Sequence, residues 1–211
     1  MKIVLASNNA KKLAELQSLF CDLPIQLVAQ GALGVIEAEE PHVTFVENAL
    51  AKARNAARAT GLPAIADDSG LCVDALGGAP GVQSAVYAPA PPAAADREAQ
   101  RRVQDAANNA LLLQRVQGRP DRRCRFVSTL VALRHADDPE PLIAYGRWEA
   151  TLLDAPRGSG GFGYDPLVWI ESLGASVAEL DAVTKNRSSH RALAATQMRA
   201  LMRQAWNLLP P

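Results

Sequence analysis

The chain has 211 residues, 48% of them hydrophobic and 21% charged, which is typical of one globular domain or two closely joined lobes. Its 22 basic residues balance its 22 acidic residues, so no global positive field exists to hold nucleic acid, and we expect no such partner. The N-terminal apolar run is too short for a signal peptide and no segment is long enough to span a bilayer, so we expect a cytoplasmic protein with no membrane partner.

The N-terminal pattern is strand, polar turn, helix and strand. Residues 2–6 and 25–29 predict strands, and leucines at helical spacing over 13–20 predict a helix. A strand-to-helix turn offers free N–H groups and the helix dipole, which suit a phosphate, although a plain helix cap is the alternative. The residues of this turn are Ser7, Asn8, Asn9, Ala10, Lys11 and Lys12.

An acidic loop containing Glu37, Glu39 and Glu40 leads into the next predicted helix. Thr44 and Glu47 have capping-box spacing, so the helix should begin there. We expect Gly61 and Pro63 to end it. Its buried stripe should consist of Val46, Leu50, Ala53 and Ala57.

Residues 63–70 (PAIADDSG) are the most informative stretch of the chain. An apolar strand ends in Asp67 and Asp68, a polar turn should follow, and 71–75 predict another strand. Adjacent carboxylates repel each other, and a divalent cation such as Mg²⁺ would neutralise them. The alternative is an Asx-type turn with both carboxylates solvated.

The C-terminal two-thirds mix both kinds of element. The Ala/Pro-rich residues 88–95 are expected to be mobile, and a helix is predicted over 96–117. Its buried side should carry Val103, Ala107, Ala110, Leu111 and Leu113. Further predictions are an antiparallel hairpin from 124–134 and 141–153, a strand at 166–170 and a helix over 188–207. These elements predict an α/β fold with a mixed central sheet flanked by helices.

Two polar segments in this part are candidates for ligand contact. The glycine-rich stretch 160–166 carries Phe162, whose ring could stack on a base or, alternatively, plug the core together with Tyr164. Lys185 and the sequence Ser189-His190-Arg191 collect donors near a helix start. Positive charge there is unfavourable for the helix dipole, which tilts the interpretation towards function.

Several kinds of catalytic and metal-binding site are excluded because the sequence lacks their motifs. The chain has only three histidines and no HExxH, CxxC or GxSxG motif, which excludes the common zinc, metalloprotease and serine-hydrolase sites. The cysteines Cys21, Cys72 and Cys124 form no disulfide framework. Only five of the 22 basic residues are lysines, a weak hint that some positions need a compact ammonium.

Taken together, the segments resemble the inosine triphosphatase family (Ham1/RdgB type) over nearly the whole chain. The similarity rests on five motifs in family order: Ser7-x-Asn9-x-x-Lys12-x-x-Glu15, Thr44-Phe45-x-Glu47-Asn48-Ala49, the run from Ala66 to Leu71 with Leu76 to Gly81, Gly161 to Pro166, and Ser189-His190-Arg191. The chain departs from the family pattern at Asn8, Val86 and Thr184.

The resemblance implies a single domain over 1–211, with two lobes and an active-site cleft between them. It implies Mg²⁺-dependent hydrolysis of ITP, dITP and XTP to the monophosphate and pyrophosphate by a homodimer. By position, Ser7 to Lys12 would hold the triphosphate, Glu40 and Asp68 the metal, and Asp68 would also be the base. The other implied contacts to substrate are Ser69, Phe162 stacking on the base with Gly163 and Tyr164 beside it, and Asp165, Lys185, His190 and Arg191 lining the pocket.

Asp67 is given a supporting role, because neighbouring residues of an extended strand point to opposite faces. Two alternatives remain open. One is a pyrophosphatase of the same fold that acts on modified pyrimidine nucleotides, and the other is a nucleotide-binding module without turnover.

Overall fold

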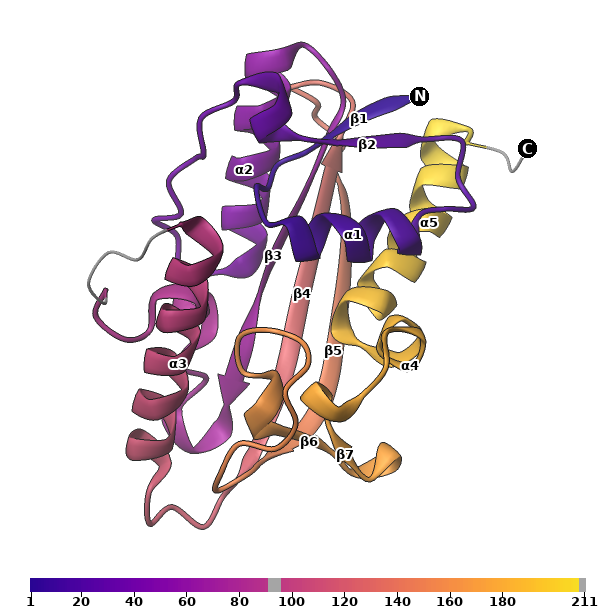
Figure 1. Ribbon diagram of the computed structural model, residues 1–211. Coiled ribbons are helices and arrows are strands. Elements are labelled where there is room, and N and C mark those ends of the chain that lie inside the picture. Colours follow the sequence, from indigo (N-terminus) through magenta and orange to yellow (C-terminus); the bar gives the residue numbers. More distant parts are fainter. Residues whose placement is uncertain (91–95, 209–211) are drawn as a thin grey trace. The chain divides into compact units, whose positions relative to one another are not determined.

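The computed structural model describes residues 1–90 and 96–208 (Figure 1). Residues 91–95, which make up most of the stretch expected to be mobile, lie outside the described residues. The chain divides into two compact units. Unit 1 comprises Met1–Asp68, Ser128–Arg147 and Asn186–Pro211, and unit 2 comprises Ser69–Val127 and Trp148–Lys185.

The helices are α1 (Ala10–Leu19), α2 (Phe45–Thr60), α3 (Arg97–Val116), α4 (Ala182–Ser188) and α5 (His190–Trp206). The strands are β1 (Lys2–Leu5), β2 (Gln26–Ala29), β3 (Ala64–Val73), β4 (Arg123–Leu133), β5 (Leu142–Leu152), β6 (Val168–Ile170) and β7 (Ala175–Ser176). They form one seven-stranded sheet in the order β2-β1-β3-β4-β5-β6-β7. β1 pairs parallel with β2 and β3, whereas β6 pairs antiparallel with β5 and β7, which confirms the predicted mixed sheet.

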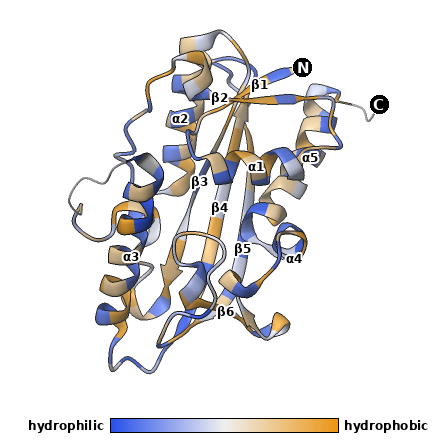
Figure 2. Ribbon diagram, viewed as in Figure 1, coloured by the Kyte–Doolittle hydropathy of each residue, from blue (hydrophilic) through white to orange (hydrophobic). Residues whose placement is uncertain are grey.

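In unit 1, alternate strand residues pack against different helices. Ile3 and Ile65 belong to a cluster with α1 and α5, whereas Val4 and Ala66 belong to a cluster with α2. Apolar residues, orange in Figure 2, run along β1 and β2. Because side chains alternate along a strand, α1 and α5 cover one face of the sheet in unit 1 and α2 covers the other (Figure 1).

The helix starts follow their capping residues. Asn9, Thr44, Asp96 and Ser189 cap α1, α2, α3 and α5, and each side chain accepts a hydrogen bond from a backbone N–H of the first turn. Gly61 ends α2 in the left-handed conformation, as predicted. Of the predicted α2 stripe, Ala53 and Ala57 are buried, whereas Val46 and Leu50 are only half-buried.

The predicted turn after Asp68 is wrong, because β3 continues without interruption from Ala64 to Val73. Asp67 and Asp68 point to opposite faces, and each has a cationic partner in unit 1. The repulsion between the two carboxylates is therefore compensated separately on each face, and Ser69 and Gly70 extend the strand.

The predicted buried side of α3 is only partly confirmed, because Leu113 packs against the core and Ala107 and Leu111 are half-buried, whereas Ala110 is exposed. Val103 is 43% exposed, and the residues at the buried positions are Asn108, Leu112 and Val116. Asn108 accepts from the Ala88 N–H at 2.8 Å and donates to two backbone carbonyls at 3.2 Å. A polar residue that is satisfied by backbone groups interrupts the apolar pattern from which the stripe was predicted. The short helix α4 and the strand β7 were not predicted.

A glycine in β5 allows α5 to lie directly on the strand. A Cβ atom at Gly146 would lie 1.8 Å from the carbonyl oxygen of His190 and 2.7 Å from the backbone nitrogen of Ala194. We expect Gly146→Ala to lower the free energy of unfolding by about 1–3 kcal/mol or more, because helix and strand must separate. Urea denaturation measures this effect. Ile143→Val, at an exposed position of the same strand, is the control and should change the free energy of unfolding by less than about 0.5 kcal/mol. If the two variants were equally stable, the close packing of α5 on Gly146 would be contradicted.

Among the described residues, no helix is both long enough and apolar enough to cross a membrane.

Candidate functional site

Asp67 lies at the centre of a buried ion-pair network on the face of the sheet that α1 and α5 cover. Its Oδ2 atom lies 2.8 Å from the Lys12 ammonium and 3.2 Å from the Arg191 guanidinium, and the Ser128 hydroxyl donates to its Oδ1 atom at 2.7 Å. Burial would raise the pKa of Asp67, but Lys12 and Arg191 hold it well below its usual range. Asp67 is therefore an ionised anchor, consistent with the supporting role expected for it.

Arg191, in the first turn of α5, is only 1% exposed. It also forms an ion pair with Glu15 of α1. The positive charge that is unfavourable at this helix start is thus compensated by two carboxylates. Since its guanidinium is engaged in the interior of unit 1, a direct contact of Arg191 with substrate stays a prediction.

Asp68 points to the opposite face of the sheet, towards α2. Its Oδ1 atom accepts a hydrogen bond from the Lys52 ammonium at 2.7 Å, and the same ammonium donates to Glu40 Oε2 at 3.0 Å. Burial raises the pKa of Asp68 to about 6, although Lys52 opposes the shift. The structure therefore brings the two predicted metal ligands together through a lysine that the sequence analysis had not assigned.

The atoms of this cluster fit a hard cation. Asp68 Oδ2 is buried and has no hydrogen-bond partner within residues 1–90 and 96–208. No group of three or more His, Cys, Asp and Glu side chains that could hold a metal ion occurs in the same described part. A pair of carboxylates is nevertheless typical of Mg²⁺ sites, because this ion keeps several waters and binds substrate phosphates as well. Glu40 and Asp68 would hold it.

The turn before α1 is an ordered helix cap. Asn9 Oδ1 accepts from the backbone N–H groups of Lys11 and Lys12 at 3.0 and 3.3 Å, and Ser7 Oγ accepts from the Asn9 N–H at 3.1 Å. The plain-cap alternative is thus realised, and phosphate binding by this turn stays a prediction. Ala10 and Lys11 are exposed in the first turn of α1.

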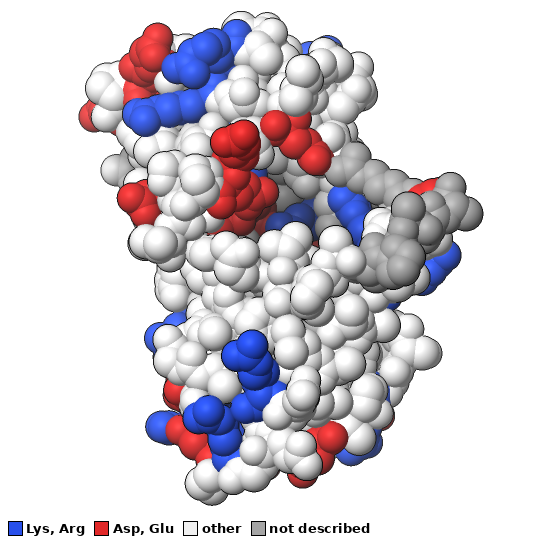
Figure 3. All heavy atoms as spheres, turned by 90° about the vertical axis from the view of Figure 1, so that its left-hand side faces the viewer, with Lys and Arg blue, Asp and Glu red and all other residues white. Residues whose placement is uncertain are grey.

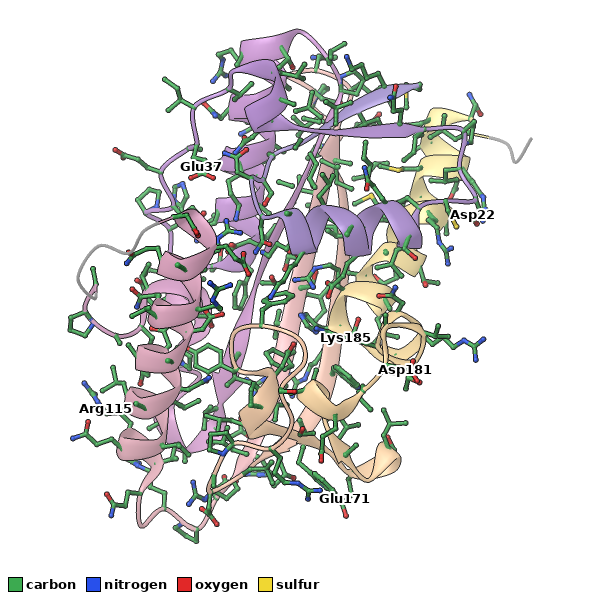
Figure 4. All side chains as sticks on the ribbon, viewed as in Figure 1. Asp22, Glu37, Arg115, Glu171, Asp181 and Lys185 are labelled. Carbon is green, nitrogen blue, oxygen red and sulfur yellow. The ribbon has the colours of Figure 1, made fainter. Side chains whose placement is uncertain are left out.

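Asn8 links this turn to the acidic stretch before α2. Its amide donates to Glu37 Oε1 at 2.9 Å, and Glu37 is labelled on that stretch in Figure 4. Acidic side chains gather in a patch on the face drawn in Figure 3. In unit 1, Glu37, Glu39, Glu40 and Glu47 are exposed. This concentration of negative charge favours cations near Asp68.

In unit 2, Asp165 organises the glycine-rich segment. Its Oδ2 atom accepts from the Phe162 N–H at 3.0 Å and from the Lys185 ammonium at 2.8 Å. Lys185, labelled on α4 in Figure 4, lies over the Phe162 ring with its Nζ atom 4.7 Å from the centroid. The Lys185 ammonium therefore contacts both the Phe162 ring and the Asp165 carboxylate, and all three are predicted site residues.

Gly163, the next residue of this segment, is bound on both backbone groups by α3. Asp105 Oδ2 accepts from its N–H at 2.8 Å, and Asn109 Nδ2 donates to its carbonyl at 3.0 Å. Tyr164 is 4% exposed and its hydroxyl donates to the Ser84 carbonyl at 2.9 Å. Tyr164 is thus a core residue, the alternative that the sequence left open.

Ser69 and His190 are two further predicted site residues. Ser69 is half-buried in β3 of unit 2, and His190 is the first residue of α5 and 5% exposed. The predicted contacts of Ser69 and His190 with substrate stay predictions.

Residues 3–201 match the model of the Ham1 family. The chain belongs to the Ham1 family. A dITP/XTP pyrophosphatase of Methylibium petroleiphilum is 72% identical over 206 residues, which cover 98% of this chain and 99% of that protein. A dITP/XTP pyrophosphatase of Leptothrix cholodnii is 68% identical over 211 residues, which cover 99% of this chain and 100% of that protein.

Solved structures agree with this assignment. A HAM1 protein from Coxiella burnetii is 42% identical with a TM-score of 0.85, covering 97% of this chain and 99% of that one. The Ham1 protein of Staphylococcus aureus is 32% identical with a TM-score of 0.81, and the match covers 97% of this chain and 100% of that one.

Sequence reasoning assigned no role to several residues that contact the predicted site residues within their own unit. They are Glu15, Lys52, Asp105, Asn109 and Ser128. For two of them the sequence contains an indication: Lys52 is one of only five lysines, and Glu15 belongs to the first motif of the family. The other three give none, because their role depends on contacts far away in the sequence.

Proposed function

We propose that this Ham1 protein hydrolyses dITP, XTP and ITP to the nucleoside monophosphate and pyrophosphate, with Mg²⁺ as cofactor. The near full-length similarity to two dITP/XTP pyrophosphatases, at 72% and 68% identity, supports the reaction. The observation that carries the proposal is the buried carboxylate of Asp68, with a pKa of about 6 and one oxygen atom without a hydrogen-bond partner in the described part of the chain.

Asp68 would act as the general base on water. A pKa of about 6 lets the carboxylate be ionised at neutral pH while remaining basic enough to accept a proton. When bound, Mg²⁺ would neutralise charge on the phosphates. Asp67 is unsuited to the role of base, because Lys12 and Arg191 hold its pKa low and contact its Oδ2 atom, while the Ser128 hydroxyl donates to Oδ1.

The groups for binding are divided between the two units. In unit 1, Lys12 and the Ser7–Lys12 turn would bind the triphosphate, which brings about four negative charges. In unit 2, the Phe162 ring would stack on the base, with Lys185 and Asp165 beside it. Hypoxanthine and xanthine present a 6-keto acceptor where adenine presents an amino donor, and a donor aimed at that oxygen would reject ATP by about 10⁴-fold.

A panel of triphosphates tests the proposal. The purified chain is incubated with Mg²⁺ and dITP, XTP, ITP, ATP, GTP or modified pyrimidine triphosphates, and products are identified by chromatography. We expect monophosphate and pyrophosphate from the first three substrates at much higher kcat/KM than from the others. Faster turnover of modified pyrimidines, stepwise release of phosphate, or binding without turnover would each replace the proposal by another function.

Replacing Phe162 tests the assignment of the base-binding unit. Since stacking on an aromatic ring is worth about 1–3 kcal/mol per base, Phe162→Ala should raise KM for dITP by about 5-fold to 150-fold. Phe162→Tyr keeps the ring and serves as the matched control with a nearly unchanged KM. An unchanged KM in Phe162→Ala would show that the ring only fills the core.

We further propose that the protein is a homodimer and is cytoplasmic. Light scattering of the purified chain measures the first property, and a monomer mass would contradict it. Fractionation of cells that produce the chain measures the second.

A further inference from the structure

The cluster of Lys52, Glu40 and Asp68 contains a cation of its own. The Lys52 ammonium lies 2.7 Å from Asp68 Oδ1 and 3.0 Å from Glu40 Oε2, and its side chain is only 11% exposed. Two carboxylates at hydrogen-bond distance favour the charged form of a lysine. The lysine is therefore charged and held between the two carboxylates that are proposed to bind metal.

We infer that Lys52 competes with the divalent cation in the nucleotide-free protein, so that the metal binds weakly until the triphosphate is present. This inference rests on the proposed assignment of Glu40 and Asp68 as metal ligands. An ammonium on the same carboxylates lowers their combined charge from −2 to −1 and repels a second cation at short range.

The geometry explains why the competition is partial. Lys52 occupies Oδ1 of Asp68, whereas Oδ2 has no hydrogen-bond partner in the described residues and remains available to an ion. The backbone that carries Lys52 is anchored, because the buried residues Ala49, Ala53 and Ala56 pack α2 into the core of unit 1. A triphosphate changes the balance, since its negative charges offer both cations an additional partner.

The consequence concerns the order of binding. Free Mg²⁺ would seldom occupy the nucleotide-free protein, and metal and triphosphate would enter together. Lys52 also keeps Glu40 and Asp68 from repelling each other while no metal is bound. It is thus a positioning residue for the metal ligands before it takes any part in the reaction.

Titration with Mn²⁺, without nucleotide, tests the inference. Free Mn²⁺ is measured by electron paramagnetic resonance in the full chain and in Lys52→Met. Because removal of an adjacent positive charge favours cation binding, we expect Lys52→Met to bind Mn²⁺ at least about tenfold tighter than the natural chain. Lys2→Met removes the same charge from an exposed position of unit 1 and should leave the affinity unchanged. Equal or weaker binding in Lys52→Met would overturn the inference.

A double variant locates the ion. Adding Asp68→Asn to Lys52→Met should abolish the gain in affinity; a gain that persists would place the ion elsewhere and also overturn the inference. Thermal unfolding without metal checks the fold, and Lys52→Gln replaces the Met variant if that one does not fold. The titration contains no triphosphate, so its failure leaves the proposed hydrolysis untouched, and failure of the substrate panel leaves the metal competition standing.

Discussion

Replacement of Asp68 by Asn should abolish pyrophosphate release from dITP while the protein remains folded. The amide keeps the shape of the side chain but cannot accept a proton from water, and loss of a general base costs about 10²-fold to 10⁴-fold in rate. Loss of a metal-binding oxygen adds to this effect. The measurement is kcat for dITP, with circular dichroism as the check on folding.

Asp67→Asn is not a suitable neutral control, because it disturbs the buried network. Asp137→Asn is better matched, since it removes one carboxylate from a side chain of unit 1 that is 90% exposed. That variant should keep its full rate. Full activity in Asp68→Asn would assign the base to another residue.

The pH dependence of the natural chain follows from the same carboxylate. Its pKa is raised from 3.8 to about 6 because burial disfavours the charged form. The base must be ionised to work, so kcat/KM should increase with pH through about 6 and then level off. This profile reports the nucleotide-free protein. Activity that is undiminished at pH 5 would contradict a base with this pKa.

Asp67→Ala should have the largest effect on stability. It leaves Arg191 and Lys12 without their shared carboxylate in the interior of unit 1, where Asp67 is 2% and Arg191 1% exposed. Breaking a buried ion pair by removal of one partner costs about 3–5 kcal/mol, because the remaining charge stays desolvated. Urea denaturation at pH 7 measures this loss.

An exposed ion pair provides the control for this experiment. Arg58 and Asp137 lie 3.7 Å apart with side chains 67% and 90% exposed, so Asp137→Ala should cost less than about 1 kcal/mol. The pKa of Asp67 is depressed in the folded protein, so its stabilisation is present above the ordinary pKa of 3.8 and is lost as the pH falls below it. Asp67→Ala should therefore reduce the loss of stability in acid. Similar costs for the buried and exposed variants would contradict the anchoring role.

The elements of unit 1 were the most predictable part of the fold. β1, α1, β2 and the start of α2 follow from local signals: apolar runs, leucine spacing and capping residues. These signals act within a few residues of the chain and need no tertiary information. The same holds for Ser189 as the N-cap of α5.

The predictions for β3 and α3 differ from the structure because of contacts between residues that are far apart in the sequence. β3 was predicted to end at the two aspartates, because the polar run from Asp67 to Gly70 is typical of a turn and the sequence does not show Lys12 and Lys52 on opposite faces. Asn108 interrupts the apolar pattern of α3, yet its backbone partners around Ser84 make burial favourable. In both cases polar residues are buried because distant partners satisfy them.

The candidate site was predictable in its types of residue more than in its contacts. Glu40, Asp68, Phe162 and Lys185 were proposed from polar segments and the family resemblance, and the structure places each in a cluster within its own unit. Lys52, the shared partner of Glu40 and Asp68, could not be assigned because a helical lysine usually faces solvent. Only the folded chain shows it between the two carboxylates.

Because side chains alternate strictly along β3, the number of residues before its two aspartates cannot change by one without altering the face to which each aspartate points. Inserting or deleting one residue between Ala64 and Asp67 would exchange the two neighbouring aspartates, turning the structural anchor towards Lys52 and the proposed base towards the arginine of α5. No substitution elsewhere would restore both environments at once. Changes in chain length should therefore be tolerated in the connecting loops of unit 1, whereas a single-residue indel in this strand should eliminate catalysis and stability together.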